Sequence, residues 1–130
     1  MSHHLPSLPL ENISSLLLNV MDVLAEKPAP AGQDAYLLHL FHSPDITVSL
    51  AQIQGTLNSH YHGTHSETIY VLKGKGQALV EGQWVDLTPG LVMHFQGGQV
   101  HGARAEAGDK LVFLCLFVPG MKEIDRVFVD

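Results

Sequence analysis

Short β-rich runs between closely spaced turn residues constrain the fold of this chain most. Pairs that favour turns recur along it, at Ser43-Pro44, Glu81-Gly82, Pro89-Gly90, Gly97-Gly98 and Gly108-Asp109. Short strands with turn signals about every 8 to 12 residues are typical of antiparallel sandwiches and barrels. We therefore predict an all-β fold. The expected strands are YLLHLF (36–41), ITVSLAQIQ (46–54), ETIYVLKG (67–74), QALVEGQ (77–83), WVDLTPG (84–90), LVMHF (91–95), GARAE (102–106) and KLVFLCLFV (110–118).

One segment, residues 11 to 25, has helical periodicity. Its apolar residues recur at spacings that place them on one helical face, and Asn12 is suited to be the N-cap. Pro28 and Pro30 would end the helix soon after. We expect this N-terminal helix to pack over an end or flank of the sheet, with a subunit contact as the alternative. The apolar residues are Ile13, Leu16, Leu17, Val20, Met21 and Leu24.

The run 111–118 is apolar on both faces of the expected strand. Strand residues alternate between faces, so Leu111, Phe113, Cys115 and Phe117 point one way and the residues between them point the other. A strand that is apolar on both faces is usually buried on both faces. The interior of the barrel covers one face, and the helix or a second subunit covers the other, which leads us to expect a homodimer.

Composition excludes several classes of function. The 130 residues suit one domain, and a net charge of −6 with 7 scattered Lys and Arg disfavours nucleic-acid binding. The start lacks the basic region of a signal peptide, and no run is long enough to span a membrane. Cys115 is the one cysteine, which favours a reducing compartment, and we expect it to be a buried apolar side chain in a cytoplasmic protein. His3 and His4 are expected to be solvated.

The segment HYHGTHSE, residues 60–67, concentrates three histidines and a glutamate. On a strand, His60 and His62 share a face with Cα atoms roughly 6.6 Å apart, close enough for both rings to reach one ion. A hairpin after the turn at 63–66 would bring Glu67 beside them. Two imidazoles and a carboxylate leave open positions on a metal. His101, near Gly98 and Gly102, is the best candidate for a fourth ligand.

The other histidines carry weaker signals. His65 lies in the turn, where solvation is favoured over a ligand role. His39, His42 and His94 stand alone in strand-like contexts, and we assign them no metal role.

These residues resemble the two sequence motifs of the cupin superfamily. The first motif reads Gly55, then His60-Tyr61-His62, four residues, Glu67, six residues and Gly74. The second reads Gly90, five residues, Gln96-Gly97-Gly98, two residues and His101. Gln96 replaces the usual proline, and Ala105 replaces the usual asparagine. The resemblance implies a small single-domain cupin, which is a double-stranded β-helix or jelly-roll.

The resemblance also implies a site and a division of the chain. His60, His62, Glu67 and His101 would bind a divalent transition metal inside the barrel. The ligand set suits Fe, Mn, Ni, Zn or Cu without choosing among them. Residues 1–35 would form an arm and helix, 36–119 the cupin barrel, and 120–130 an extension that packs on the barrel or on a partner subunit.

Two functions fit this site. The first is a metal-dependent dioxygenase or isomerase that acts on a small oxygenated molecule such as a diketone, phenolic or sugar, with Glu67 as base as well as ligand. The second is a non-catalytic module that binds a sugar or organic acid and holds a structural metal. The fold hosts many activities, so the sequence does not name the substrate. Four further residues are candidates to line a pocket, although packing or surface roles are more usual for them: Tyr61, Tyr70, Trp84 and Arg104.

Overall fold

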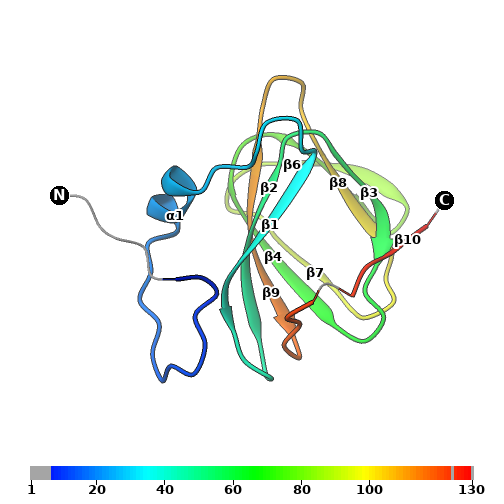
Figure 1. The fold of residues 1–130 in the computed structure, drawn as a ribbon. Coiled ribbons are helices and arrows are strands. Elements are labelled where there is room, and N and C mark those ends of the chain that lie inside the picture. Colours follow the sequence, from blue (N-terminus) through cyan, green and yellow to red (C-terminus); the bar gives the residue numbers. More distant parts are fainter. Residues whose placement is uncertain (1–6, 124, 130) are drawn as a thin grey trace.

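The chain folds into two five-stranded antiparallel sheets that face each other (Figure 1). The computed structural model describes residues 7–123 and 125–129. One sheet has the order β1-β2-β9-β4-β7 and the other β10-β3-β8-β5-β6, which confirms the all-β prediction. The elements are α1 (Val20–Glu26), β1 (Ala35–His42), β2 (Thr47–Ile53), β3 (Thr56–Tyr61), β4 (Ser66–Lys73), β5 (Gly76–Val80), β6 (Gln83–Leu87), β7 (Val92–Phe95), β8 (His101–Ala105), β9 (Leu111–Val118) and β10 (Val127–Phe128).

The main core lies between the two sheets, and strand β9 contributes to it along its whole length. Leu111, Phe113, Cys115 and Phe117 alternate along β9, and each is buried in this core. Alternation follows from the two-residue period of a strand. This inward face is the one expected from the alternation of residues 111–117 in the sequence.

A second, smaller core covers the outer face of the β1-β2-β9 sheet. Val23 of α1 is fully buried there against Leu40, Leu50 and Val112. Figure 1 shows α1 lying outside the barrel, beside this sheet. Strand β9 is therefore covered on both sides at Val112, and the chain's own helix supplies the outer cover. The homodimer stays a prediction.

The helix is shorter than the sequence analysis predicted. It spans Val20–Glu26 instead of residues 11 to 25. Its N-cap is Asn19, whose side chain accepts a hydrogen bond of 2.9 Å from the backbone N–H of Met21. The prediction of Asn12 as N-cap is wrong, since that residue has φ 56°, in the left-handed region.

Tertiary contacts explain the late start of the helix. The backbone of Leu10 is tied to β1, donating to the Leu40 carbonyl and accepting from the His42 N–H. The first part of the apolar stripe is exposed, with Leu17 fully so, whereas Val20 and Leu24 pack against the second core. A short helix is marginal without packing, so only the part around Val23 becomes helical. Within the described residues, no helix has the length and apolarity needed to cross a membrane.

Gly74 lies where the chain passes from one sheet to the other, between β4 and β5. It has φ +94°, and a Cβ atom there would lie 1.9 Å from the Lys110 carbonyl oxygen. Gly90 has a similar φ of +99° with no atom within 4 Å of the added Cβ. We expect Gly90→Ala to cost about 1 kcal/mol of backbone strain, and Gly74→Ala to cost more than about 2 kcal/mol because the backbone must also move.

Urea unfolding of the two variants measures this difference. The two glycines have similar positive φ angles and differ in the space available to a Cβ atom, so Gly90→Ala is the matched control. Equal losses of unfolding free energy would contradict the role assigned to the close approach at Gly74.

Candidate metal centre

The two sheets bring the four candidate ligands together. His60 on β3 is directly opposite His101 on β8 in the register of the antiparallel pair. Residues that face each other across such a pair project to the same side of the sheet. His62 follows β3 two residues after His60 and therefore shares its face. Glu67 is the second residue of β4 and enters from the other sheet.

The predicted hairpin between the histidines and Glu67 does not form. Strands β3 and β4 belong to different sheets and do not pair. The connecting turn crosses the gap between the sheets, and the Asp125 carboxylate holds it by accepting hydrogen bonds from the N–H groups of Gly63 and Thr64 at 2.8 and 3.2 Å. Glu67 thus reaches the histidines across the barrel rather than along one sheet.

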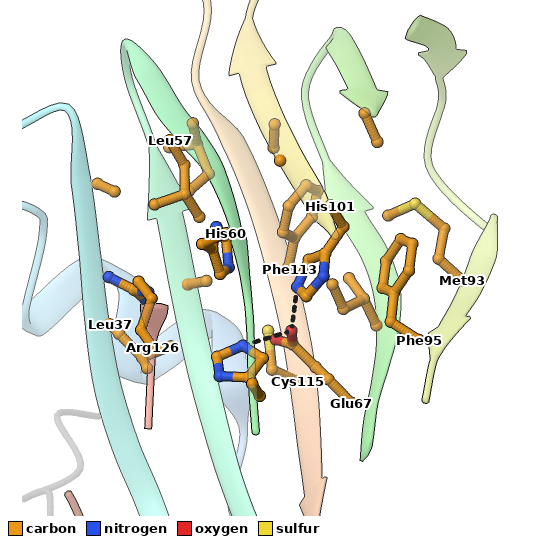
Figure 2. A pocket seen from close by; sticks show the side chains of 18 of the residues that line it. Leu37, Leu57, His60, Glu67, Met93, Phe95, His101, Phe113, Cys115 and Arg126 are labelled. Carbon is orange, nitrogen blue, oxygen red and sulfur yellow. Dashed lines mark hydrogen bonds and ion pairs between the residues drawn. The ribbon is translucent and has the colours of Figure 1, made fainter. Parts of the chain in front are cut away.

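The three imidazoles form a tight, buried group. One ring nitrogen of each lies within 4.8 Å of one in the others, a spacing that could hold a metal ion. Ring centroids of His60 and His101 are 4.4 Å apart, and those of His62 and His101 are 5.3 Å apart. Glu67 Oε1 is 3.0 Å from His101 Nε2 and 3.3 Å from His62 Nε2. Dashed lines in Figure 2 mark these two contacts.

Backbone carbonyls orient all three rings. The Nδ1 atoms of His60 and His101 lie 2.8 and 3.0 Å from the carbonyl oxygens of Asn58 and Gln99. A carbonyl only accepts, so each Nδ1 carries the proton and donates it. The lone pair of each neutral ring is then on Nε2. This arrangement is the usual outer support of a metal-binding histidine.

His62 is oriented in the same way, by a more distant part of the chain. Its Nδ1 lies 2.5 Å from the carbonyl oxygen of Asp125, 63 positions later in the sequence. The sequence did not indicate this partner, because nothing in the local pattern relates the two segments.

The hydrogen bonds also test whether a cation fits. The Nδ1 atoms of His62 and His101 face carbonyls, and their Nε2 atoms face the Glu67 carboxylate. A neutral imidazole has one N–H, so it cannot donate to acceptors on both sides. A proton or a metal ion between the Nε2 atoms and the carboxylate resolves the conflict. The donor set of three nitrogens and one oxygen fits a divalent transition metal.

Electrostatics favour the forms that bind metal. Burial raises the pKa of Glu67, but hydrogen bonds from His101 and His62 outweigh it and lower the pKa to about 2. Burial lowers the pKa of His60 to about 4. At neutral pH, Glu67 is therefore an anion and His60 is neutral, as metal ligands must be.

The candidate ligands lie in a cavity of about 250 Å³ inside the barrel. Most of its wall is apolar, and Phe95 stacks on the ring of His101 with centroids 4.2 Å apart. Glu67 is the only carboxylate among the described residues that line it. Figure 2 shows His60, Glu67 and His101 in the middle of the cavity, between Leu37 on one side and Met93 and Phe95 on the other.

The remaining candidates from the sequence lie elsewhere. His65 in the turn is 3.4 Å from the Asp125 carboxylate, and His94 is 2.9 Å from the Thr68 hydroxyl. His39 and His42 contact Ser49 and Thr47. None of these four belongs to the three-histidine group, and His3 and His4 are outside the described residues. The four pocket candidates do not line the cavity either: Tyr61, Tyr70, Trp84 and Arg104.

Three lining residues carry polar groups that the sequence analysis did not select for the pocket. Gln33 precedes β1, Tyr36 is in β1, and Arg126 comes from the C-terminal segment. The thiol of Cys115, predicted as a buried apolar side chain, also lines the cavity; burial raises its pKa and keeps it protonated. These residues sit outside the two motifs, so motif spacing could not indicate them.

The two motif departures are accommodated by the backbone. The turn at Gln96 forms without proline, because the Gly98 N–H donates to the His62 carbonyl at 2.7 Å and the Gln99 N–H donates to the Gln96 carbonyl at 3.1 Å. Ala105 packs against the main core, and its N–H donates to the Gly55 carbonyl. Both departures leave His101 opposite His60.

Comparison with known proteins agrees with this architecture. An uncharacterized protein of Aquifex aeolicus is 32% identical over 98 residues, covering 75% of this chain and 80% of that protein. Quercetin 2,3-dioxygenase of Bacillus subtilis is 37% identical over 65 residues, which are 49% of this chain and 19% of the dioxygenase. An uncharacterized conserved protein of Klebsiella pneumoniae with a double-stranded β-helix domain has a TM-score of 0.73 at 21% identity, covering 89% of this chain and 98% of that one.

The family itself is shown by a match over the centre of the chain. The protein-family model described as "Cupin domain" matches residues 48–117, from β2 to β9, which is more than half of the sequence and includes all four candidate ligands. The chain therefore belongs to the cupin family.

Proposed function

We propose that this cupin is a metal-dependent enzyme, a dioxygenase or isomerase, that acts on a small oxygenated molecule. Its ion would be held by His60, His62, Glu67 and His101. The observation that carries the proposal is the buried group of three imidazoles and one carboxylate inside a cavity of about 250 Å³. Such a cavity is slightly below the range of about 300–1,000 Å³ that is usual for small-molecule sites, which suits a small substrate.

The protein's own residues would prepare the site for chemistry. A bound metal ion would polarise a carbonyl or enol oxygen of the substrate. The backbone carbonyls that bind the Nδ1 protons hold the imidazoles in position, and the apolar walls exclude water from the reacting groups.

Glu67 is better suited to be a ligand than a base. A carboxyl group with a pKa near 2 takes up a proton poorly at neutral pH. Glu67 is also the only carboxylate among the described lining residues. This observation favours the alternative function, a module that binds a sugar or organic acid around a structural metal without turning it over.

Similarity to quercetin 2,3-dioxygenase supports the proposal of a metal-dependent enzyme over that of a binding module. The aligned part is 19% of that protein, so its activity and substrate are a guide for assays rather than an assignment. The first substrates to test are flavonols, catechols, diketones and ketosugars.

Elemental analysis followed by turnover assays tests the proposal. The purified protein should contain about one transition-metal ion per chain, and restoring Fe, Mn or Ni to stripped protein should produce turnover of one of these classes. Raised melting temperatures without consumption of the ligand would favour the binding module. A protein that takes up no ion at neutral pH would overturn the metal-dependent function.

A further inference from the structure

The C-terminal segment is attached to the barrel beside the candidate metal ligands. Strand β10 pairs with β3, placing Phe128 opposite His60 and Val127 opposite Tyr61. The Val129 N–H donates to the Ser59 carbonyl at 3.0 Å, extending this attachment. The segment is thus fixed on the C-terminal side of Arg126.

Asp125 fixes the other side of Arg126. Its carboxylate accepts from the Gly63 and Thr64 N–H groups, and its carbonyl accepts from His62 Nδ1. Contacts on both sides leave the backbone at Arg126 little freedom, so the direction in which its side chain leaves the backbone is defined.

The side chain of Arg126 points into the cavity. It lines the same cavity as the four candidate ligands, and Figure 2 shows it beside Leu37, across from Met93 and Phe95. Its Nε atom is buried and has no hydrogen-bond partner among the described residues. Arg126 is also absent from the ion pairs found in that part of the chain. A buried N–H that stays unpaired costs free energy, which a ligand acceptor would recover.

The charge of the cavity calls for an anion. Glu67 contributes one negative charge and Arg126 one positive charge, since guanidinium groups stay protonated in proteins. A divalent ion at the candidate ligands would leave the cavity with a net charge of about +2. Guanidinium presents paired N–H donors that match the two oxygens of a carboxylate.

We propose that Arg126 binds the carboxylate of a 2-oxo or 2-hydroxy acid with a small apolar side chain. The 2-oxygen would face the ion, and the apolar side chain would lie against walls that include Leu37 and Phe113. This inference rests on the proposed function for the ion and adds the substrate class. A planar monoanion suits the single guanidinium and the mostly apolar wall better than a phosphate dianion does.

Calorimetric titration of the Zn-loaded full chain tests this assignment. The probes are 2-oxoisovalerate, its methyl ester, isovalerate and inorganic phosphate. We expect 2-oxoisovalerate to bind most tightly, since the ester lacks the charge and isovalerate lacks the 2-oxygen. In Arg126→Gln, the affinity for 2-oxoisovalerate should fall at least about tenfold while that for the ester changes less than about twofold. The affinity of Arg126→Lys for 2-oxoisovalerate should lie between those of the wild type and Arg126→Gln.

Arg104→Gln is the matched control. Arg104 stacks over Trp84 at 3.9 Å and donates to Gln77, outside the cavity, so its loss removes the same charge without touching the site. Metal content and melting temperature of each variant show that the ion and the fold are retained. Equal weakening of acid and ester in Arg126→Gln, no weakening of either, or tighter binding of phosphate than of 2-oxoisovalerate would overturn the proposal.

A measurement without metal separates this proposal from the function on which it rests. In chelator-treated protein, isovalerate should shift the Nε–H NMR signal of Arg126, which is assigned by its loss in Arg126→Gln. The shift needs the carboxylate and the guanidinium but no ion. A shift in a protein that takes up no metal would support the role of Arg126 while the metal-dependent function fails. The absence of a shift would count against Arg126 directly.

Discussion

Replacing His101 with alanine will lower the metal content of the protein from about one ion per chain to less than about a tenth of that at matched ion concentration. Loss of an outer partner of a metal ligand already costs about 10–100-fold in affinity, and loss of a direct ligand costs at least as much. His101 is 4% exposed and its Nε2 lies 3.0 Å from Glu67 Oε1, so the substitution removes a nitrogen from the centre of the buried group. Elemental analysis after gel filtration measures the change.

The same substitution will remove the stabilisation that metal confers. An ion present at 1,000 times its dissociation constant raises the free energy of unfolding by about 4 kcal/mol. Wild-type protein should therefore melt at a higher temperature with metal than with chelator, whereas His101→Ala should melt alike in both. Comparison within each protein also cancels the loss of the stacking contact with Phe95.

His94→Ala is the control for a histidine outside the site. His94 is exposed on β7 and contacts the Thr68 hydroxyl, so its removal should leave metal content unchanged. His62→Ala should behave like His101→Ala. Full metal content in both of these site variants would place the ion elsewhere in the chain.

The metal-free protein will lose stability as the pH falls from about 6.5 towards 5. Burial holds the pKa of folded His60 at about 4, whereas an unfolded histidine has a pKa near 6.5. Between these values the unfolded state binds more protons, so the free energy of unfolding decreases with decreasing pH. The full shift corresponds to about 2 kcal/mol once solvent screening is allowed for.

Glu67 adds to the acid sensitivity at lower pH. Its folded pKa of about 2 lies below the ordinary value of 4.5, so its contribution is present above pH 4.5 and is lost as the pH falls towards 2. The window between pH 5 and 6.5 thus isolates the histidines from the carboxylates.

Urea unfolding with chelator at several pH values measures the effect of His60. Burial also lowers the pKa of His39, so the contribution of His60 is the difference in slope between the wild type and His60→Gln. His94→Ala should keep the slope of the wild type. Identical slopes for the wild type and His60→Gln would contradict a lowered pKa at His60.

Features with a short sequence period could be predicted from the sequence. His60 and His62 share a face because a strand repeats every two residues, and the apolar alternation of β9 follows the same rule. Turn residues marked most strand ends, because their backbone preferences also depend only on neighbouring residues. Motif spacing singled out Glu67 and His101, and the structure brings both to the histidines.

Helical periodicity predicted the length of the N-terminal helix less well. The stripe in residues 11 to 25 predicted a helix about twice as long as α1, because periodicity reports what a segment can bury and not what is available to bury it. Leu17 continues the stripe in sequence, yet its side chain is fully exposed in the fold.

By itself, the sequence determined the strand periods, the turns and the identity of the candidate metal ligands. Only the tertiary structure decided that Glu67 reaches the histidines from the opposite sheet, and that Asp125 and Arg126 return to the site from the end of the chain. The physical reason is the range of the interactions. Backbone geometry acts over a few residues, whereas the pairing of β10 with β3 and the bond from His62 to Asp125 join segments more than 60 positions apart, which no local pattern encodes.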